Sequence, residues 1–209
     1  MRIEKGGMVL QSINSQKLVA VIRAKSYEDA MRIGENCIAA GIGALEITFT
    51  IPEAERVIRD LCEKYNGKDV LIGAGTVLDP ETARIAILAG ATFVVSPIVN
   101  ADMIRLCHRY RVDSVAGAYT PNEVYAALNC GADMIKIFPG SGCSPAYIKD
   151  LHGPFPDAEF MVTGNVTPEN AATWFAHGVS VVGIGSALTK LALNGETEEL
   201  RRCVKQVIA

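Results

Sequence analysis

Short apolar runs alternate with amphipathic stretches along this chain, and one arrangement of the two recurs four times. A helical stretch ends at a small residue and a glycine, and a short apolar run rich in Val and Ile follows. The four glycines are spaced 49, 41 and 47 residues apart, at Gly41, Gly90, Gly131 and Gly178. Because glycine after a helix is the usual left-handed cap and such runs are typical of buried strands, the pattern predicts repeated helix–strand units.

Further apolar runs lie between these units and bring the number of expected strands to eight. They are 18–23, 70–74, 113–116 and 159–162. Four of the intervening helices have a clear start, the first at an N-cap serine and the others at a proline in the first turn. These helices are 26–39, 80–88, 121–129 and 168–176.

Unbroken apolar strands that alternate with helices indicate a parallel sheet covered on both faces. Eight units in 209 residues leave about 26 residues for each, which suits a compact, closed (β/α)₈ barrel. We therefore expect a single α/β domain over residues 1–209, a TIM barrel with an extra N-terminal helix near 8–15 that closes its bottom. An open doubly wound sheet is the structural alternative.

The composition excludes several classes of protein. Hydrophobic residues make up 49% and charged residues 21%, which excludes a disordered chain. The net charge of −3, without a basic cluster, argues against a nucleic-acid partner. No apolar run approaches the roughly 20 residues that cross a bilayer, and the polar start lacks a signal core, so we expect a cytoplasmic protein with no membrane partner. The six cysteines form no C-x-x-C pair, which indicates neither a disulfide framework nor a metal site.

Lys136 lies in a short apolar run, 132–139, that otherwise has the pattern of a buried strand. Lysine is rarely fully buried, because removing an ammonium group from water is costly unless something compensates. A lysine in an apolar site loses affinity for its proton, and the neutral amine is a nucleophile for carbonyl carbons. Lys136 therefore predicts Schiff-base chemistry on a keto or aldehyde substrate. The alternative is a strand-end lysine that reaches water or pairs with a carboxylate.

Glu46 has the same desolvation problem in the second strand, where it shares one face with Ala44 and Thr48. If Glu46 and Lys136 both face the barrel interior, each explains the presence of the other. A buried carboxylate can exchange protons near neutral pH, which is what a general acid/base requires. The alternative is an ion pair with a purely structural role.

The carboxyl ends of the strands, where such barrels build their active sites, carry further polar residues. Gly164-Asn165 and Gly185-Ser186 follow the seventh and eighth strands, where many barrels hold a phosphate. Glycines let backbone N–H groups approach the anion, and the next helix N-terminus adds positive potential. Arg23, at the end of the first strand, either clamps a substrate carboxylate or forms an ion pair at the rim.

Six segments resemble the 2-keto-3-deoxy-6-phosphogluconate (KDPG) / 4-hydroxy-2-oxoglutarate (KHG) aldolases. They are 46–48 (EIT), 72–78 (IGAGTVL), 95–97 (VSP), 120–123 (TPNE), 136–139 (KIFP) and 183–188 (GIGSAL). The resemblance runs from about residue 17 to residue 188, with the motifs in order. It implies a class I aldolase that needs neither metal nor cofactor, forms a (β/α)₈ barrel, is usually a homotrimer, and acts on a small keto-acid sugar, phosphorylated or not.

The same resemblance implies roles for residues around the keto group of the substrate. Lys136 would form the Schiff base with the keto carbon of pyruvate. Glu46, acting through a bound water, would move protons at the hydroxyl and at the enamine carbon. Thr76 and Pro97 would line the pyruvate pocket, and Phe138 would pack beside the lysine.

The other half of the substrate would lie near Thr163, with the phosphate received by Gly164, Asn165, Gly185 and Ser186. Three positions depart from the family pattern. Many relatives carry at position 50 an arginine that grips the substrate carboxylate, whereas this chain has Thr50, and Arg23 is its expected replacement. Ala116 stands where a proline is usual. Asn165 replaces a glycine, which leaves phosphate affinity and substrate choice open, because asparagine can crowd the anion or donate to it.

The leading functional hypothesis is reversible cleavage of 2-keto-3-deoxy-6-phosphogluconate to pyruvate and glyceraldehyde 3-phosphate. The same chemistry on the galactonate epimer, on 4-hydroxy-2-oxoglutarate or on an unphosphorylated sugar acid is a close variant. A phosphosugar isomerase or epimerase would need paired carboxylates, histidines or a metal, and the strand ends offer one carboxylate, Glu46. A non-catalytic barrel that binds a phosphorylated ligand is the third possibility.

Overall fold

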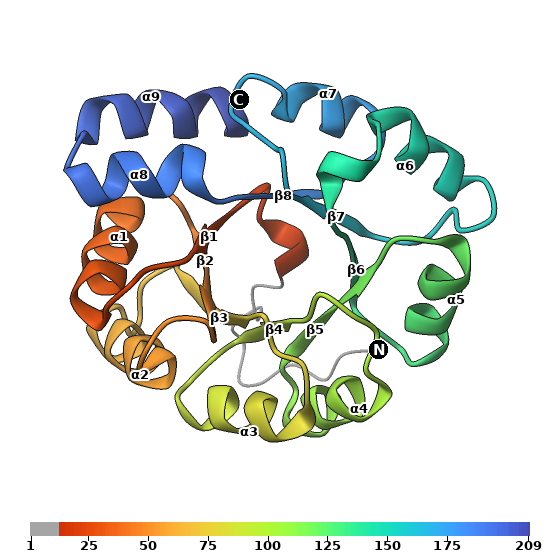
Figure 1. Cartoon of the computed structure of the whole chain (residues 1–209), viewed down its shortest axis with the longest axis horizontal. Coiled ribbons are helices and arrows are strands. Elements are labelled where there is room, and N and C mark those ends of the chain that lie inside the picture. The colour runs from red at the N-terminus through yellow and green to blue at the C-terminus, as the bar shows by residue number, and fades with distance from the viewer. Residues whose placement is uncertain (1–12) are drawn as a thin grey trace.

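Eight parallel strands close into a barrel in the computed structural model, which describes residues 13–209 (Figure 1). The strands follow one another around the barrel in chain order, and β8 returns to pair with β1, with Ala20 opposite Ile184. They are β1 Leu18–Ile22, β2 Ala44–Thr48, β3 Leu71–Gly75, β4 Phe93–Val95, β5 Asp113–Ala118, β6 Met134–Ile137, β7 Phe160–Thr163 and β8 Val181–Ile184. This closed order confirms the predicted (β/α)₈ barrel over the open doubly wound sheet.

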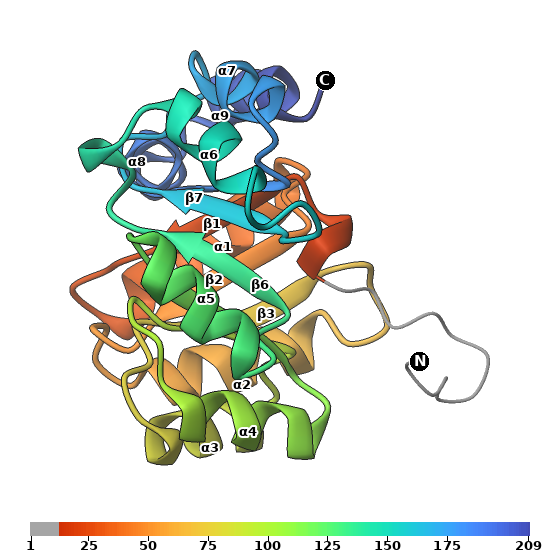
Figure 2. The same ribbon diagram turned by 90° about the vertical axis from the view of Figure 1, so that its right-hand side faces the viewer.

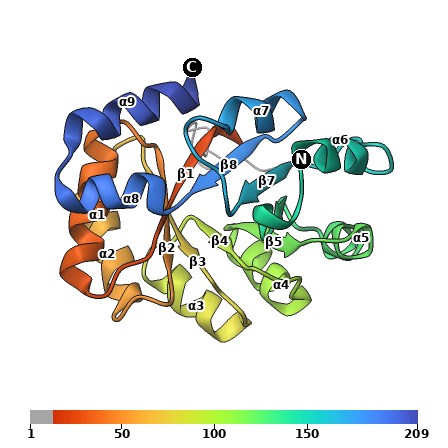
Figure 3. The same cartoon turned by 45° about the horizontal axis from the view of Figure 1, so that its top comes forward.

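Helices follow the strands and form the outer ring of the barrel (Figure 1). They are α1 Tyr27–Ala39, α2 Ala54–Lys64, α3 Pro80–Leu88, α4 Ala101–Tyr110, α5 Pro121–Asn129, α6 Pro145–His152, α7 Ala171–Ala176, α8 Ser186–Asn194 and α9 Thr197–Ile208. As expected, Ser26 caps α1 by accepting a hydrogen bond from the Asp29 N–H, and α3 and α5 begin at their prolines. The repeating pattern does not predict α9, which has no strand before it and lies against α8 (Figure 3).

The helix expected over 168–176 begins three residues later, at Ala171. Pro168 lies instead in a turn held by Asn170, whose side-chain oxygen accepts a hydrogen bond from the Thr167 N–H at 2.9 Å. The side-chain amide of Asn170 donates to the Asn165 carbonyl, also at 2.9 Å. Such local side-chain bonds compete with helical hydrogen bonding, which explains the later start.

The helix expected near 8–15 falls mostly outside the described residues. Within them, Ile13–Ser15 form a single 3₁₀ turn. Ile13 is 1% exposed and belongs to an apolar cluster inside the barrel, so this turn contributes to closing the amino-terminal end. The cluster contains one or two alternate residues from every strand: Val19, Ala44, Leu71, Phe93, Val95, Val115, Met134, Met161 and Val181. A larger apolar cluster fills the layer between strands and helices.

Seen from the side, the strand arrows point toward one end of the barrel (Figure 2), so all eight carboxyl ends open there. Within residues 13–209, no helix is long and apolar enough to cross a membrane, and no group of three or more His, Cys, Asp or Glu side chains is arranged to hold a metal ion. All six cysteines are free thiols. Burial raises the pKa of Cys37 to about 12, so this thiol stays protonated and packs as a small apolar side chain.

Candidate active site

Lys136 and Glu46 meet inside the barrel from strands on opposite sides of it. Lys136 is on β6, Glu46 is on β2, and the distance from Nζ to Oε1 is 3.3 Å. Their side chains are 4% and 0% exposed. Alternation along each strand puts Lys136 on the same face as Met134 of the interior cluster, and Glu46 on the same face as Ala44. Both charged groups therefore face the interior, where each compensates the burial of the other.

Glycines on neighbouring strands make room for the polar side chains of this region. A Cβ atom at Gly75 of β3 would lie 2.2 Å from Glu46 Oε1, which is far inside contact distance. A Cβ atom at Gly183 of β8 would lie 2.3 Å from Thr163 Oγ1. Any larger residue at either position would displace the carboxylate or the hydroxyl, so these two glycines determine where the two polar groups lie.

Two buried oxygen atoms in this region make no hydrogen bond to the protein. Among the buried side-chain nitrogens and oxygens of residues 13–209, this is true only of Glu46 Oε2 and Thr163 Oγ1. Leaving a buried acceptor unsatisfied costs about 1–3 kcal/mol, so such atoms are uncommon and require a specific explanation. Both oxygens are available to a substrate or to water.

Residues that follow β3, β4 and β6 surround the same end of the barrel. The Phe138 ring centroid lies 5.4 Å from Lys136 Nζ, so the ring packs beside the amine. Thr76 has a φ of 58°, a left-handed conformation that is a marked outlier for a β-branched residue. Pro97 approaches β5 closely, because a Cβ at Gly117 would lie 2.1 Å from the Pro97 carbonyl carbon.

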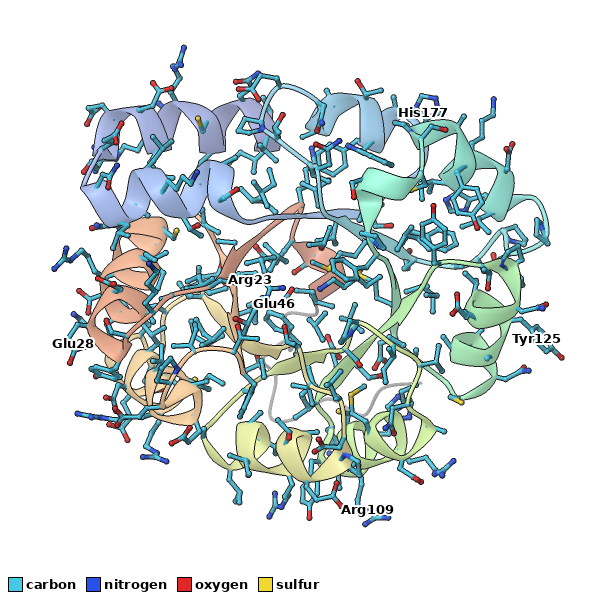
Figure 4. All side chains as sticks on the ribbon, in the orientation of Figure 1. Arg23, Glu28, Glu46, Arg109, Tyr125 and His177 are labelled. Atoms are coloured by element: carbon cyan, nitrogen blue, oxygen red, sulfur yellow. The ribbon has the colours of Figure 1, made fainter. Side chains whose placement is uncertain are left out.

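Arg23 leaves the carboxyl end of β1 as an exposed side chain. Figure 4, in the same view as Figure 1, shows Arg23 and Glu46 over the middle of the barrel, whereas its other labelled side chains lie on the outer ring. No carboxylate among residues 13–209 pairs with the Arg23 guanidinium, which argues against the rim ion pair considered from the sequence. Its charge is available to an anionic ligand.

The loop after β7 contains two residues in the left-handed conformation, and the loop after β8 leads directly into α8. Gly164 and Asn165 both have positive φ, 100° and 60°, and Asn165 is exposed. Ser186 is the first residue of α8, and Gly185 before it offers no side-chain cap, so the first N–H groups of α8, those of Ser186 and Ala187, are left to other partners. A Cβ at Gly140 would lie 2.5 Å from the Gly164 carbonyl oxygen, so the loop after β6 packs against the loop after β7.

A family model described as "KDPG and KHG aldolase" matches residues 9–203 of the chain. The chain belongs to this aldolase family. It is 37% identical to 2-dehydro-3-deoxy-6-phosphogalactonate aldolase of Escherichia coli (strain K12), over 82% of this chain and 83% of that protein. It is 33% identical to 2-dehydro-3-deoxy-phosphogluconate aldolase of Pseudomonas aeruginosa, over 92% of this chain and 88% of that protein.

Solved structures agree with this assignment. A native KDPGal structure superposes with a TM-score of 0.83 at 31% identity, covering 96% of this chain and 99% of that one. KDPG aldolase from Legionella pneumophila, with pyruvate captured as a covalent carbinolamine intermediate, superposes with a TM-score of 0.82 at 27% identity, covering 93% of this chain and 95% of that one. The aldolase is therefore a lyase of the (β/α)₈ type.

The strand ends of the aldolase also contain polar groups to which the sequence assigned no role. Thr48, on the same interior face as Glu46, is 0% exposed, and its hydroxyl donates to the Ile22 carbonyl of β1 at 2.9 Å. Thr50 lies 2.8 Å from it, hydroxyl to hydroxyl. The sequence signal for Thr48 is its place two residues after Glu46 in the strand alternation. The cross-strand partner requires the register of β1 against β2, which the sequence does not reveal.

Proposed function

We propose that this aldolase is a class I enzyme that cleaves 2-keto-3-deoxy-6-phosphogluconate to pyruvate and glyceraldehyde 3-phosphate, with Lys136 as the Schiff-base nucleophile and Glu46 as the proton shuttle. The observation that carries the proposal is the buried Lys136–Glu46 contact at the carboxyl end of the barrel. In such an arrangement the buried amine can attack a carbonyl carbon, and the neighbouring carboxylate, which has one unsatisfied oxygen, can accept and return protons.

The chemistry follows from these two groups. The neutral Lys136 amine attacks the C2 keto carbon, with Glu46 placed to accept the ammonium proton, and loss of water gives the protonated Schiff base. Glu46, through a water molecule, then takes the proton of the C4 hydroxyl. The C3–C4 bond breaks, its electrons pass into the enamine, and glyceraldehyde 3-phosphate leaves. Return of a proton to C3 and hydrolysis of the Schiff base release pyruvate and free Lys136.

The surrounding residues provide binding groups along the length of the substrate. Arg23 binds the carboxylate, and Thr76, Pro97 and Phe138 enclose the pyruvate half. Thr163, whose buried hydroxyl has no protein partner, contacts a substrate hydroxyl. The phosphate is bound by the loop after β7 and by the N-terminus of α8 after β8. The residues that receive it are Gly164, Asn165, Gly185 and Ser186.

The galactonate epimer is a second candidate substrate. It is favoured by the 37% identity to the E. coli enzyme named for 6-phosphogalactonate and by the likeness to the native KDPGal structure. The two substrates differ in configuration at C4, so both give the same products. Thr163 and Asn165 are the residues whose contacts would differ between them.

A homotrimer is the proposed assembly. One structural relative, superposing with a TM-score of 0.81 at 32% identity, belongs to a cage designed by fusing symmetric oligomeric domains. Helices α3 and α4 pack against each other, and large apolar side chains are exposed on and around them. These side chains are Leu78, Ile85, Leu88, Ile98 and Tyr110. A second copy that covers these side chains would remove them from water. Multi-angle light scattering measures the mass of the assembly in solution. Leu88 is the most exposed of these side chains, at 68%, and Leu88→Glu should lower that mass because it places a charge on the covered surface.

Borohydride trapping tests the chemistry. The protein is incubated with pyruvate and sodium borohydride, and the modified peptide is identified by mass spectrometry. We expect a stable adduct on Lys136, its loss in Lys136→Ala, and its retention in Lys149→Ala, which removes an exposed lysine of α6. Pyruvate release from each C4 epimer, in the presence and absence of a chelator, then identifies the substrate and separates this enzyme from a metal-dependent epimerase. No adduct in the folded protein would refute the proposal.

A further inference from the structure

We propose that Thr48 is a positioning residue that sets the direction of Arg23 and so tunes recognition of the substrate carboxylate. This inference rests on the proposed function, in which Arg23 binds that carboxylate. It concerns a residue that has no part in the proposed bond-making and proton transfer, and it follows from a hydrogen-bond chain across the seam between β1 and β2.

The Thr48 hydroxyl is fully used within this chain. It is 0% exposed and donates its one hydrogen to the Ile22 carbonyl at 2.9 Å. Because that hydrogen is committed, the contact of 2.8 Å with Thr50 has Thr50 as the donor. The order is therefore Thr50 to Thr48 to the Ile22 carbonyl, and hydrogen bonds in such a series strengthen one another.

The Ile22 carbonyl is the last acceptor before Arg23. The carbonyl of Ile22 and the amide nitrogen of Arg23 belong to the same rigid peptide plane, so a bond that fixes one fixes the other. The backbone register between the two strands ends at Ile22 opposite Ile47. The Thr48 side chain adds one more cross-strand bond beyond that pair, at the point where β1 stops and Arg23 begins.

Arg23 depends on such support because nothing else described holds its guanidinium. The side chain is exposed and has no carboxylate partner within residues 13–209. A long side chain in this situation loses rotamer freedom when it binds a ligand, and that loss is smaller when its backbone is fixed in advance. Without the Thr48 hydroxyl, we expect weaker binding of the carboxylate and little change at the amine, since Lys136 is held from the opposite side of the barrel by β6.

Trapping with two ketones provides the test. Acetone has the methyl ketone of pyruvate without its carboxylate, so both can form a Schiff base and only pyruvate uses Arg23. The concentration that gives half-maximal borohydride-trapped adduct is measured for each. For Thr48→Val we expect about a fivefold to tenfold rise for pyruvate and less than about a twofold change for acetone, the size expected for loss of one hydrogen bond. Thr48→Ser, which keeps the hydroxyl, should restore pyruvate binding.

Thr92→Val is the matched control. Thr92 also donates to a strand carbonyl across a seam, that of Ile72 at 3.2 Å, but it precedes β4 at the far end of the barrel. It should change neither concentration. In an Arg23→Gln background, Thr48→Val should cause no further loss of pyruvate selectivity, because the residue through which it acts is gone.

The outcomes separate the two levels of inference. An equal effect on both ketones, or none on pyruvate, would overturn the role of Thr48 while the aldolase proposal stands. No pyruvate adduct in the unsubstituted protein would refute the proposed function, and this inference with it. If circular dichroism shows that Thr48→Val does not fold, Thr50→Val decides. Thr50 is exposed, and its replacement by valine removes the outer donor of the chain. We expect Thr50→Val to raise the half-maximal trapping concentration for pyruvate and not that for acetone.

Discussion

Replacing Lys136 by methionine should destabilise the protein by far more than a typical substitution. The variant keeps the length of the side chain and removes its charge, which leaves the Glu46 carboxylate 0% exposed and without its ion-pair partner at 3.3 Å. The second oxygen of that carboxylate has no hydrogen bond in the unsubstituted protein either. Breaking a buried pair from one side costs about 3–5 kcal/mol. With a urea slope of about 2 kcal/mol per M, the unfolding midpoint should fall by about 2 M.

The double variant Lys136→Met/Glu46→Gln should recover most of that loss. Once both charges are gone, the remaining cost is an amide in place of a carboxylate, and buried pairs replaced on both sides are often close to neutral. We expect the double variant to lie within about 2 kcal/mol of the unsubstituted protein. Neither variant should form a pyruvate adduct, so stability and chemistry are expected to separate.

Urea titration followed by tryptophan fluorescence measures these changes, because Trp174 is the only tryptophan and is 4% exposed. Lys149→Met, on the exposed surface of α6, is the matched control and should shift the free energy of unfolding by no more than about 0.5 kcal/mol. The reasoning is refuted if Lys136→Met lies within about 1 kcal/mol of the unsubstituted protein. It is also refuted if the losses measured for Lys136→Met and for Glu46→Gln alone simply add in the double variant, since a buried pair requires coupling.

Two further predictions concern backbone strain and pH. Thr76→Gly and Arg111→Gly each relieve a non-glycine residue at φ 58°, so each should raise the free energy of unfolding by about 1 kcal/mol. Only Thr76→Gly should lower kcat/KM, because only Thr76 is proposed to line the site. Equal effects of the two variants on kcat/KM would contradict the placement of Thr76. Hydrogen bonds from the Tyr119 and Thr120 N–H groups lower the pKa of Glu123 below 4.5, so its contribution to stability is complete above that pH and is lost as the pH falls through the lower folded-state pKa. Glu123→Gln should therefore flatten the acid limb of the stability curve, and an unchanged limb would show that this carboxylate does not contribute.

Strand and helix existence could be predicted from the chain because each unit carries its own local signals. Glycine caps, proline starts and Val/Ile runs act within a few residues, and the helices that begin at Pro80 and Pro121 follow them. The late start of α7 depends on Asn170 bonding to Thr167 and Asn165, a choice between two local alternatives that composition does not decide. Helix α9 is not predicted by a pattern of strand–helix repeats, because it follows α8 directly and no strand precedes it.

The candidate site divides in the same way. Strand alternation predicts which residues share a face with Lys136 and with Glu46, and the cost of burying each charge alone suggests that the two face each other; the structure has them in contact. The space they occupy does not follow from alternation, because it depends on which glycine lies across the seam. Gly75 accommodates the Glu46 carboxylate only through the register that sets β3 against β2. Closed barrels fix that register through the whole ring, so no single strand sequence contains it.

Several departures from ordinary protein packing coincide at the carboxyl end of this barrel, and their coincidence is the strongest argument for a site there. A buried ion pair, an unsatisfied hydroxyl on Thr163 and a left-handed Thr76 each have structural explanations when taken alone. Each also lowers stability, by about 1–3 kcal/mol for the hydroxyl and for the backbone outlier. The amino-terminal half of the same interior is filled with apolar side chains such as Phe93 and Met161, and within residues 13–209 it carries none of these costs. A fold that can pack one half conventionally has no packing reason to leave the other half polar and strained, so the polar half is explained by what it binds.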